Sequence, residues 1–435
     1  MWLFLLCILL WWPTYSIGLV HRLPITVTGS LRTRLLNSGK WLEEVDRFTA
    51  LDAEDDSEEY YYRGFYLANI TVGTPPQQLQ VALDTCYPFF WVIDCRCTDE
   101  NCHYAKDWEY EKHCFNASKS TSLHGSGDKV TIPCHNCMDD IEAAEPWQKE
   151  RNKGYFHREQ LQIKPLHFDN QGILLVDFIE HQWANFPLDG VLGLAWPYHP
   201  MILGHKPPLM NMLDQLDQPV FTIWSDWRRP DELGGPGGFM TIGGPDNDHC
   251  SGPWHNVPLI SRWNRWTFRV DGFQIGNYRT YRPYTAAVDT GTALIGGPVH
   301  QMQMIIAATN ADYCEEDNLY TVPCDQRPKL APIVLKVNGK DIVVPAEEYI
   351  VDLNLPDGKC ALGLFGQYGA GFTTDWVLGA LFLNAYCTMF DYDKGQVSFA
   401  SSKDTIPYRD GEEFNASLHV HSRQILLHEH KKGEL

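Results

Sequence analysis

Two aspartates in different halves of the chain, Asp84 and Asp289, share a local pattern that could do acid–base chemistry. Residues 81–85 read Val-Ala-Leu-Asp-Thr, and residues 286–290 read Ala-Ala-Val-Asp-Thr. Apolar runs of this length predict buried strands. A carboxylate at the end of a buried strand must be solvated or paired, because an isolated buried charge is costly. The repeated pattern therefore suggests one shared site to which each half contributes a carboxyl group.

A second motif follows each aspartate in the same order. Residues 188–193 read Leu-Asp-Gly-Val-Leu-Gly, and residues 375–380 read Asp-Trp-Val-Leu-Gly-Ala. A single Asp-Thr could be an ordinary turn or cap. An ordered pair of motifs in both halves instead indicates a duplicated architecture.

The elements that would position these motifs are mostly strands. From Tyr60 onward, short apolar runs alternate with Gly, Pro and Asn turns, which is typical of strands. Helical patterns are few, and the best candidates are residues 208–216 and 300–309. We predict a mostly β protein of two sandwich- or barrel-like lobes. The N-terminal lobe would cover residues 60–218, and the C-terminal lobe residues 219–403.

Size and charge limit the classes of protein to consider. The chain has 435 residues, of which 44% are hydrophobic, so it can build a large core and more than one domain. Its 35 basic and 55 acidic residues give a net charge of −20. This charge argues against a nucleic-acid partner, because phosphate contacts need a basic surface. We expect the chain to be a monomer.

The first residues, 1–18, have the features of a secretory signal peptide. Residues 1–12 are almost wholly apolar but too short to span a bilayer, and residues 16–18 (Ser-Ile-Gly) fit the cleavage pattern. No later run is long enough to span a bilayer, so we expect a secreted protein or one in the endomembrane or lysosomal lumen. At the other end, residues 404–435 would form a polar tail, whose last four residues resemble an ER-retention signal.

Residues 19–59 have the charge pattern of a prosegment and linker. Basic residues occur through residues 19–50, and an acidic run follows at residues 52–59. A basic segment ahead of an acidic body can dock on it electrostatically. A solvated helix followed by an acidic linker would have the same composition.

The cysteines fit an oxidising compartment. The chain has 13, and one falls in the signal peptide, which leaves an even number for disulfides. The pairs Cys95/Cys97 and Cys134/Cys137 also have a spacing seen in metal sites, as do histidines of the tail. Disulfides and a solvated tail are the favoured interpretations, and no metal site is predicted.

Three glycosylation sequons begin at Asn69, Asn116 and Asn415. Asn69 falls within a predicted strand, which makes it the least suited of the three to carry a glycan. Together with the signal peptide, the sequons favour a glycoprotein of the secretory pathway.

The ordered motifs resemble those of the pepsin-type aspartic proteases, over roughly residues 23–400. The matching stretches are residues 66–78, 186–195, 217–221, 288–292 and 376–379. The resemblance implies two β lobes, a deep cleft between them for a peptide or protein substrate, and one aspartate from each lobe at its floor. It also implies a prosegment, which residues 30–40 resemble.

The resemblance makes Asp84 and Asp289 the catalytic residues. Two facing carboxyl groups cannot both ionise readily, so they share a proton, and pepsin is the standard example. One would take a proton from a water held between them, and the other would donate to the peptide carbonyl oxygen. This chemistry needs no cofactor. Thr85 and Thr290 would brace the two loops by hydrogen bonds from each hydroxyl to the opposite backbone.

Further supporting features come from the same resemblance. Gly291 and Thr292 complete the second motif, and Cys97–Cys102 and Cys324–Cys360 are the implied disulfides. The other cysteines have no assigned partner. Where relatives carry a prosegment lysine that blocks the aspartates, only Arg47 could take its place.

The first motif departs from the family pattern, whereas the second is intact. Cys86, Tyr87 and Pro88 stand where the family has Gly-Ser-Ser. Cys86 adds a side chain at a crowded place, Tyr87 removes a serine hydroxyl that bonds the aspartate, and Pro88 removes an N–H donor. Losing donors would raise the pKa of Asp84.

The flap over the cleft also departs from the pattern. Counting forward places Cys-His-Asn-Cys at residues 134–137, where relatives have Tyr-Gly-Ser-Gly, and an insertion would follow at residues 138–153. Counting backward places Trp147 at the tyrosine position instead. A Cys134–Cys137 bridge could form at the tip. The missing tyrosine should lower the rate, because a flap excludes water and positions the substrate.

Two functions remain open on the sequence. The first is an aspartic endopeptidase made as a secreted precursor, which rests on Asp84 and Asp289. The second is a protein of the same fold that binds peptide or protein without cleaving it, which rests on the altered first motif and flap. A thiol hydrolase using Cys86 is disfavoured because no histidine or asparagine is placed to activate the thiol.

Overall fold

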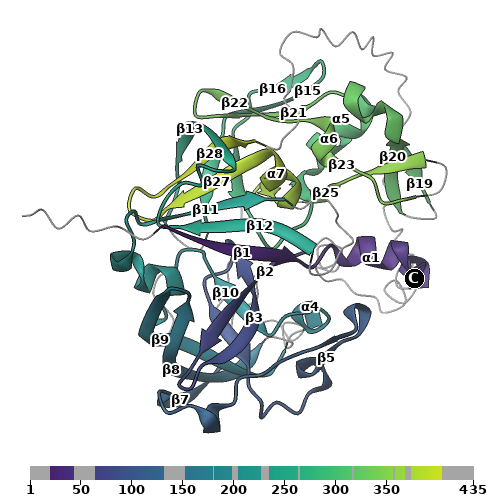
Figure 1. Cartoon of the computed structure of the whole chain (residues 1–435). Coiled ribbons are helices and arrows are strands. Elements are labelled where there is room, and N and C mark those ends of the chain that lie inside the picture. The colour runs from purple at the N-terminus through teal and green to yellow at the C-terminus, as the bar shows by residue number, and fades with distance from the viewer. Residues whose placement is uncertain are drawn as a thin grey trace, which may run out of the picture.

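The computed structural model of the chain describes residues 20–43, 64–131, 152–179, 181–197, 204–226, 235–262, 265–315, 318–355, 358–367 and 374–403. Several predictions lie outside these residues, and they concern the signal peptide, Arg47, the acidic run, Cys134, Cys137, Trp147, Asn415 and the polar tail. The described part is mostly β, as expected, and forms two bodies with strand β1 running between them (Figure 1).

One 13-stranded sheet runs through both halves, in the order β13-β28-β27-β11-β12-β1-β2-β3-β10-β4-β9-β8-β7. Its strands are β1 (His21–Val27), β2 (Tyr66–Val72), β3 (Gln77–Asp84), β4 (Phe90–Ile93), β7 (His124–Thr131), β8 (Lys153–Ile163), β9 (Leu166–Phe178), β10 (Gly190–Gly193), β11 (Val220–Ser225), β12 (Gly235–Ile242), β13 (Cys250–Pro258), β27 (Tyr386–Asp391) and β28 (Gln396–Ser402). The strand β1 is antiparallel to both β12 and β2, so it joins the strands of the two halves.

Four smaller sheets complete the fold, in the orders β14-β17-β26-β18-β25, β16-β15-β21-β22, β19-β20-β24-β23 and β5-β6. Their strands are β5 (Tyr104–Ala105), β6 (Tyr110–Glu111), β14 (Thr267–Val270), β15 (Gly272–Ile275), β16 (Tyr278–Thr280), β17 (Tyr284–Val288), β18 (Ile295–Pro298), β19 (Asp312–Cys314), β20 (Leu319–Pro323), β21 (Ile333–Val337), β22 (Lys340–Val344), β23 (Ile350–Val351), β24 (Lys359–Leu362), β25 (Leu364–Gln367) and β26 (Trp376–Leu378). All but β5 and β6 belong to the second half.

The described helices are short. They are α1 (Leu31–Asn37), α4 (His181–Ala184), α5 (Val299–Thr309), α6 (Ala346–Tyr349), α7 (Ala380–Ala385) and the 3-10 helices η1 (Glu100–Cys102), η2 (Lys106–Trp108), η3 (Ala117–Lys119), η5 (Pro208–Asn211), η6 (Leu213–Gln215) and η7 (Cys324–Lys329). The helix predicted at residues 300–309 is α5. The one predicted at residues 208–216 is instead η5 and η6, where the side chains of Asn211 and Gln215 both bond to β9.

The duplication expected from the sequence is present in the strand pairing. In the first half, β3 is parallel to β10, β10 antiparallel to β4, and β4 parallel to β9. In the second half, β17, β26, β18 and β25 repeat the same three pairings. The glycines of the second motif permit a close approach in both, because a Cβ on Gly193 would lie 2.5 Å from the Tyr87 carbonyl oxygen, and one on Gly379 would lie 2.4 Å from that of Thr292.

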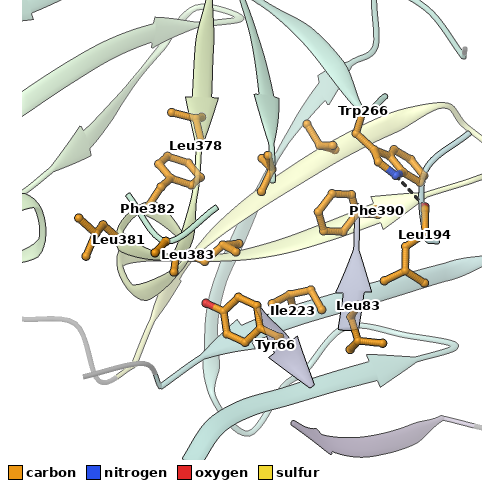
Figure 2. Close-up of a cluster of buried hydrophobic side chains, with 14 of the residues drawn as sticks. Tyr66, Leu83, Leu194, Ile223, Trp266, Leu378, Leu381, Phe382, Leu383 and Phe390 are labelled. Atoms are coloured by element: carbon orange, nitrogen blue, oxygen red, sulfur yellow. Dashed lines mark hydrogen bonds between the residues drawn. The ribbon is translucent and has the colours of Figure 1, made fainter. Parts of the chain in front are cut away.

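A single hydrophobic cluster connects the two halves (Figure 2). Tyr66 and Leu83 from the first half lie beside Ile223 and Phe390 from the second. The indole of Trp266 donates a hydrogen bond of 3.0 Å to the Leu194 carbonyl across the same boundary. The two motif-bearing halves are therefore held by a shared core as well as by β1.

Four disulfides lie within the described residues: Cys95–Cys114, Cys97–Cys102, Cys250–Cys387 and Cys324–Cys360. Two of them are the pairs that the resemblance implied, and the other two had no assignment. Because Cys95 and Cys97 are both oxidised, neither can supply a thiolate to a metal. In the described part of the chain, no helix is long and apolar enough to cross a bilayer.

Candidate active site

The strand ends bring the two aspartates into equivalent positions. Strand β3 ends on Asp84, and β17 ends one residue before Asp289. Both side chains are buried, with 0% and 3% of their surface exposed. The parallel neighbour fixes each strand end, because the Leu194 amide donates to the Asp84 carbonyl (2.8 Å) and the Asp289 amide donates to the Leu378 carbonyl (3.0 Å). We call residues 84–90 the Asp84 loop and residues 289–295 the Asp289 loop.

Gly291 shows that the two carboxylates approach each other. A Cβ placed on Gly291 would lie 3.1 Å from Asp84 Oδ2 and 3.2 Å from Asp289 Oδ1. Carboxylate oxygens from different halves of the chain therefore border the same point. Any side chain at position 291 would press on both of them.

The threonines that follow the aspartates bind the two loops together. The Thr85 hydroxyl donates to the Val288 carbonyl (2.8 Å) and accepts from the Thr290 amide (3.1 Å). Reciprocally, the Thr290 hydroxyl donates to the Leu83 carbonyl (2.7 Å) and accepts from the Thr85 amide (3.0 Å). Both threonines are fully buried, so these bonds are shielded from water and have the symmetry of the duplication.

Both aspartates accept a backbone amide from the residue two positions ahead. The Cys86 amide donates to Asp84 Oδ1 (2.8 Å), and the Gly291 amide donates to Asp289 Oδ1 (2.7 Å). Cys86 therefore keeps the backbone donor that Gly291 supplies in the other loop. The Cys86 sulfur is accommodated 3.6 Å from the Val288 carbonyl oxygen.

The two half-sites differ at the next position. The Thr292 hydroxyl donates to Asp289 Oδ2 (2.9 Å). Its equivalent, Tyr87, is 1% exposed, and its ring packs against Phe89 and Trp183 with centroid distances of 5.4 and 5.9 Å. Tyr87 therefore contributes its ring to the hydrophobic core of the first half.

A second pair of aspartates supports the strands behind the site. Asp189 Oδ2 accepts the Gln80 amide (2.8 Å), and Asp375 Oδ2 accepts the Thr285 amide (2.7 Å). Gln80 and Thr285 each lie four residues before a site aspartate. Burial raises the pKa of Asp189, although its hydrogen bonds oppose this. The aspartate of the second repeated motif thus has a structural function in both halves.

The N-terminal segment contacts both halves close to the site. In α1, the Arg34 guanidinium donates to the Asp107 carbonyl and lies 4.7 Å above the Trp108 ring. Arg32 donates to the Asn318 carbonyl of the second half. A cavity of about 400 Å³ lies between α1 and the second half, and Ser30, Arg32, Leu294, Leu319 and Leu381 are among the residues that line it.

The sequons and the flap are described in part. Asn69 lies in β2, as expected, yet its side chain is exposed to solvent, so the strand does not hide it. Asn116 is half-buried and caps η3, where its side chain accepts from the Ser118 amide. Strands β7 and β8 form a hairpin whose last described pair is Thr131 with Lys153.

A group of potential metal ligands was not foreseen from the sequence. Cys324, Asp352 and Cys360 lie together, but the two cysteines are bonded to each other as a disulfide. Thiolates are the form of cysteine that binds metals, so this group does not constitute a metal site.

The sequence also gave no reason to single out His205. Its ring is buried and lies 3.2 Å from the Phe90 amide and 3.2 Å from the Pro88 carbonyl oxygen. Phe90 lies 115 residues from His205 in the chain. No local sequence motif could therefore have predicted this contact.

The sequence is similar to those of known proteins. The family model described as eukaryotic aspartyl protease matches residues 65–402. Aspartic protease 17 of Caenorhabditis elegans is 31% identical over 400 residues, which cover 91% of this chain and 98% of the relative. Aspartic protease 1 of the same organism is 32% identical over 390 residues, or 88% and 95% of the two chains. Cathepsin D of Chionodraco hamatus is 29% identical over 405 residues, again 88% and 95%. The chain therefore belongs to the eukaryotic aspartyl protease family.

Proposed function

We propose that the protein is an aspartic endopeptidase in which Asp84 and Asp289 act as one catalytic pair. The observation that carries the proposal is the convergence at Gly291, where oxygens of both carboxylates border the same point. Burial makes it costly to ionise both groups at such proximity, so the pair would share one proton and titrate as a unit.

The reaction would use only side chains of this protein and a water. The ionised carboxylate takes a proton from the water as its oxygen attacks the peptide carbonyl. The protonated carboxyl donates to the carbonyl oxygen as negative charge develops there. The reciprocal Thr85 and Thr290 hydrogen bonds keep the loops in register, and positional accuracy of this kind accounts for a large part of catalysis.

We also propose that the chain is a secreted or lumenal glycoprotein precursor with a prosegment at residues 19–59. Four disulfides in the described residues support an oxidising compartment. The contacts of Arg32 and Arg34 with opposite halves support docking of the segment near the site. Arg22 adds ion pairs with Asp246 (3.4 Å) and Asp248.

Peptide hydrolysis by the purified protein, from acid to neutral pH, tests the assignment. The full chain and the chain nicked after the N-terminal segment are both assayed, beside Asp289→Asn and the exposed control Asp312→Asn. Loss of a catalytic acid–base group should lower the rate by about 10³-fold, whereas the control keeps full activity. Activity that survives Asp289→Asn would overturn the assignment. No hydrolysis at any pH, with tight binding of a statine-containing peptide, would instead favour a non-cleaving binding protein.

A further inference from the structure

At two equivalent positions, the Asp84 and Asp289 loops contact different groups. In the Asp289 loop, the Ile295 amide donates to the Gly363 carbonyl (3.1 Å), and the Ala293 carbonyl accepts from the Leu381 amide (3.3 Å). Both partners are main chain. Counted from their aspartates, Ala293 and Ile295 correspond to Pro88 and Phe90 of the Asp84 loop.

In the Asp84 loop, one side chain meets both of the equivalent groups. His205 Nε2 lies 3.2 Å from the Phe90 amide and 3.2 Å from the Pro88 carbonyl oxygen. The imidazole also packs on the Phe89 ring, with centroids 5.3 Å apart. His205 therefore contacts three consecutive residues of the loop whose first residue is Asp84.

The position of His205 is itself fixed. The neighbouring Lys206 carbonyl accepts from Gln171 Nε2 (3.0 Å), and Asn211 Nδ2 donates to Gln171 Oε1 (2.8 Å). Gln171 is fully buried in β9. An amide network from β9 to η5 thus anchors the backbone that carries the imidazole.

We propose that His205 is a positioning residue for Asp84: at the Phe90 amide, its Nε2 takes the place of the Gly363 carbonyl that holds the equivalent Ile295 amide of the Asp289 loop. This rests on the proposed peptidase function. Neutral His205 accepts the Phe90 N–H at Nε2, which ties the start of β4 to the β9–η5 side of the lobe. The loop that lost its glycine and serine is in this way supported from elsewhere in the chain.

The contact depends on the protonation of the ring. A proton on Nε2 turns the acceptor into a donor, so a charged imidazole donates to the Pro88 carbonyl and loses the Phe90 amide. Burial lowers the pKa of His205 to about 4, the Pro88 carbonyl opposes this, and Arg158 lowers it further. Phe89, Pro88 and Phe90 carry no charge, and Nδ1 is buried without a hydrogen-bond partner. The ring is therefore neutral above about pH 4.

Two substitutions separate the hydrogen bond from the packing. In the full-length protein, His205→Phe keeps a flat ring but removes the acceptor, and His205→Gln keeps an acceptor that does not titrate. His167, which is exposed, provides the control His167→Phe. Amide hydrogen exchange of residues 86–90, kcat and KM on a peptide substrate, and affinity for a statine-containing peptide are measured for each.

We expect His205→Phe to lose exchange protection at Phe90 and to lower kcat by about 10- to 100-fold, with KM changed less than about threefold. His205→Gln should restore both and should change the acid side of the kcat–pH profile. Unchanged protection and kcat in His205→Phe, or a His205→Gln variant no better than His205→Phe, would overturn the proposal.

The test also distinguishes this proposal from the proposed function. If the unaltered protein hydrolyses no peptide, the peptidase assignment fails by itself. His205 is then judged from exchange and from affinity for the statine-containing peptide. Equal values in His205→Phe and the unaltered protein would overturn its positioning role.

Discussion

The Asp84 and Asp289 loops have the same backbone arrangement and different side-chain support. Each aspartate accepts an amide from two residues ahead, and each following threonine binds the opposite loop. The Asp289 loop adds the Thr292 hydroxyl, while the Asp84 loop has the buried Tyr87 ring at that position. The comparison teaches that main-chain donors survive side-chain replacement, because they depend on strand pairing alone.

The two loops are also supported by different parts of the molecule. Both loops have main-chain partners, such as Ala195 for the Asp84 loop and Gly363 for the Asp289 loop. The Asp84 loop uses Tyr87, whose cluster includes Leu31 and Leu35 of the N-terminal segment, and His205 from beyond β10. The Asp84 half-site is therefore coupled to more of the molecule.

The largest expected effect on stability is at the position where the two loops differ. Tyr87→Ser restores a small hydroxyl residue but empties a fully buried aromatic site, so the free energy of unfolding should fall by about 3 kcal/mol. Urea denaturation measures this, with Tyr281→Ser as control because Tyr281 is 66% exposed. A stable Tyr87→Ser protein with raised kcat would show that the ring is not a core element.

The next effect is the pH dependence that His205 adds to the Asp84 side. Its folded pKa of about 4 lies below the ordinary 6.5, so the unfolded chain binds the proton first, and stability falls as pH drops from 6.5 to about 4. His205→Gln lacks this fall. Relative to the unaltered protein, the variant should gain up to about 3 kcal/mol of unfolding free energy across that range. Parallel stability–pH curves from urea titrations would contradict the buried neutral imidazole.

The bracing threonines test the symmetric part of the comparison. Thr85→Val and Thr290→Val each remove a buried hydroxyl that donates once and accepts once, and each should cost about 2 kcal/mol of stability. Because the two hydroxyls lie 3.5 Å apart and brace the same pair of loops, the double variant should lose less than the sum. Thermal unfolding measures all three. A large loss in one single variant and none in the other would show that the brace is not reciprocal.

The smallest effect compares the same position in the two loops. Gly291→Ala places a Cβ 3.1 Å from Asp84 Oδ2 and 3.2 Å from Asp289 Oδ1, and should lower kcat/KM by about tenfold. At the equivalent position of the other loop, the native Cys86 already has a Cβ. Cys86→Ala should therefore change kcat/KM by less than about threefold. Steady-state kinetics on one peptide compares the two. Equal losses would mean that the loops are equally crowded.

Much of the fold was predictable because the duplication is visible in the sequence as two pairs of repeated motifs. Strands ending at Asp84 and Asp289, and the glycines at 193 and 379, follow from local patterns whose physical causes are also local. The pairings Cys95–Cys114 and Cys250–Cys387 were not predictable, since spacing does not specify connectivity. The 3-10 turns at residues 208–215 and the contact of His205 with the Asp84 loop also depend on packing between distant segments.

The central claim is that two unlike half-sites hold Asp84 and Asp289 as one catalytic pair. Its most direct test is kcat/KM for Asp84→Asn, Asp289→Asn and the double variant on one peptide substrate, with folding checked by urea denaturation. The account predicts that each single variant loses about 10³-fold or more, and that the double variant loses little beyond that, because the groups act as a unit. A folded single variant that retains activity, or losses that multiply in the double variant, would contradict it.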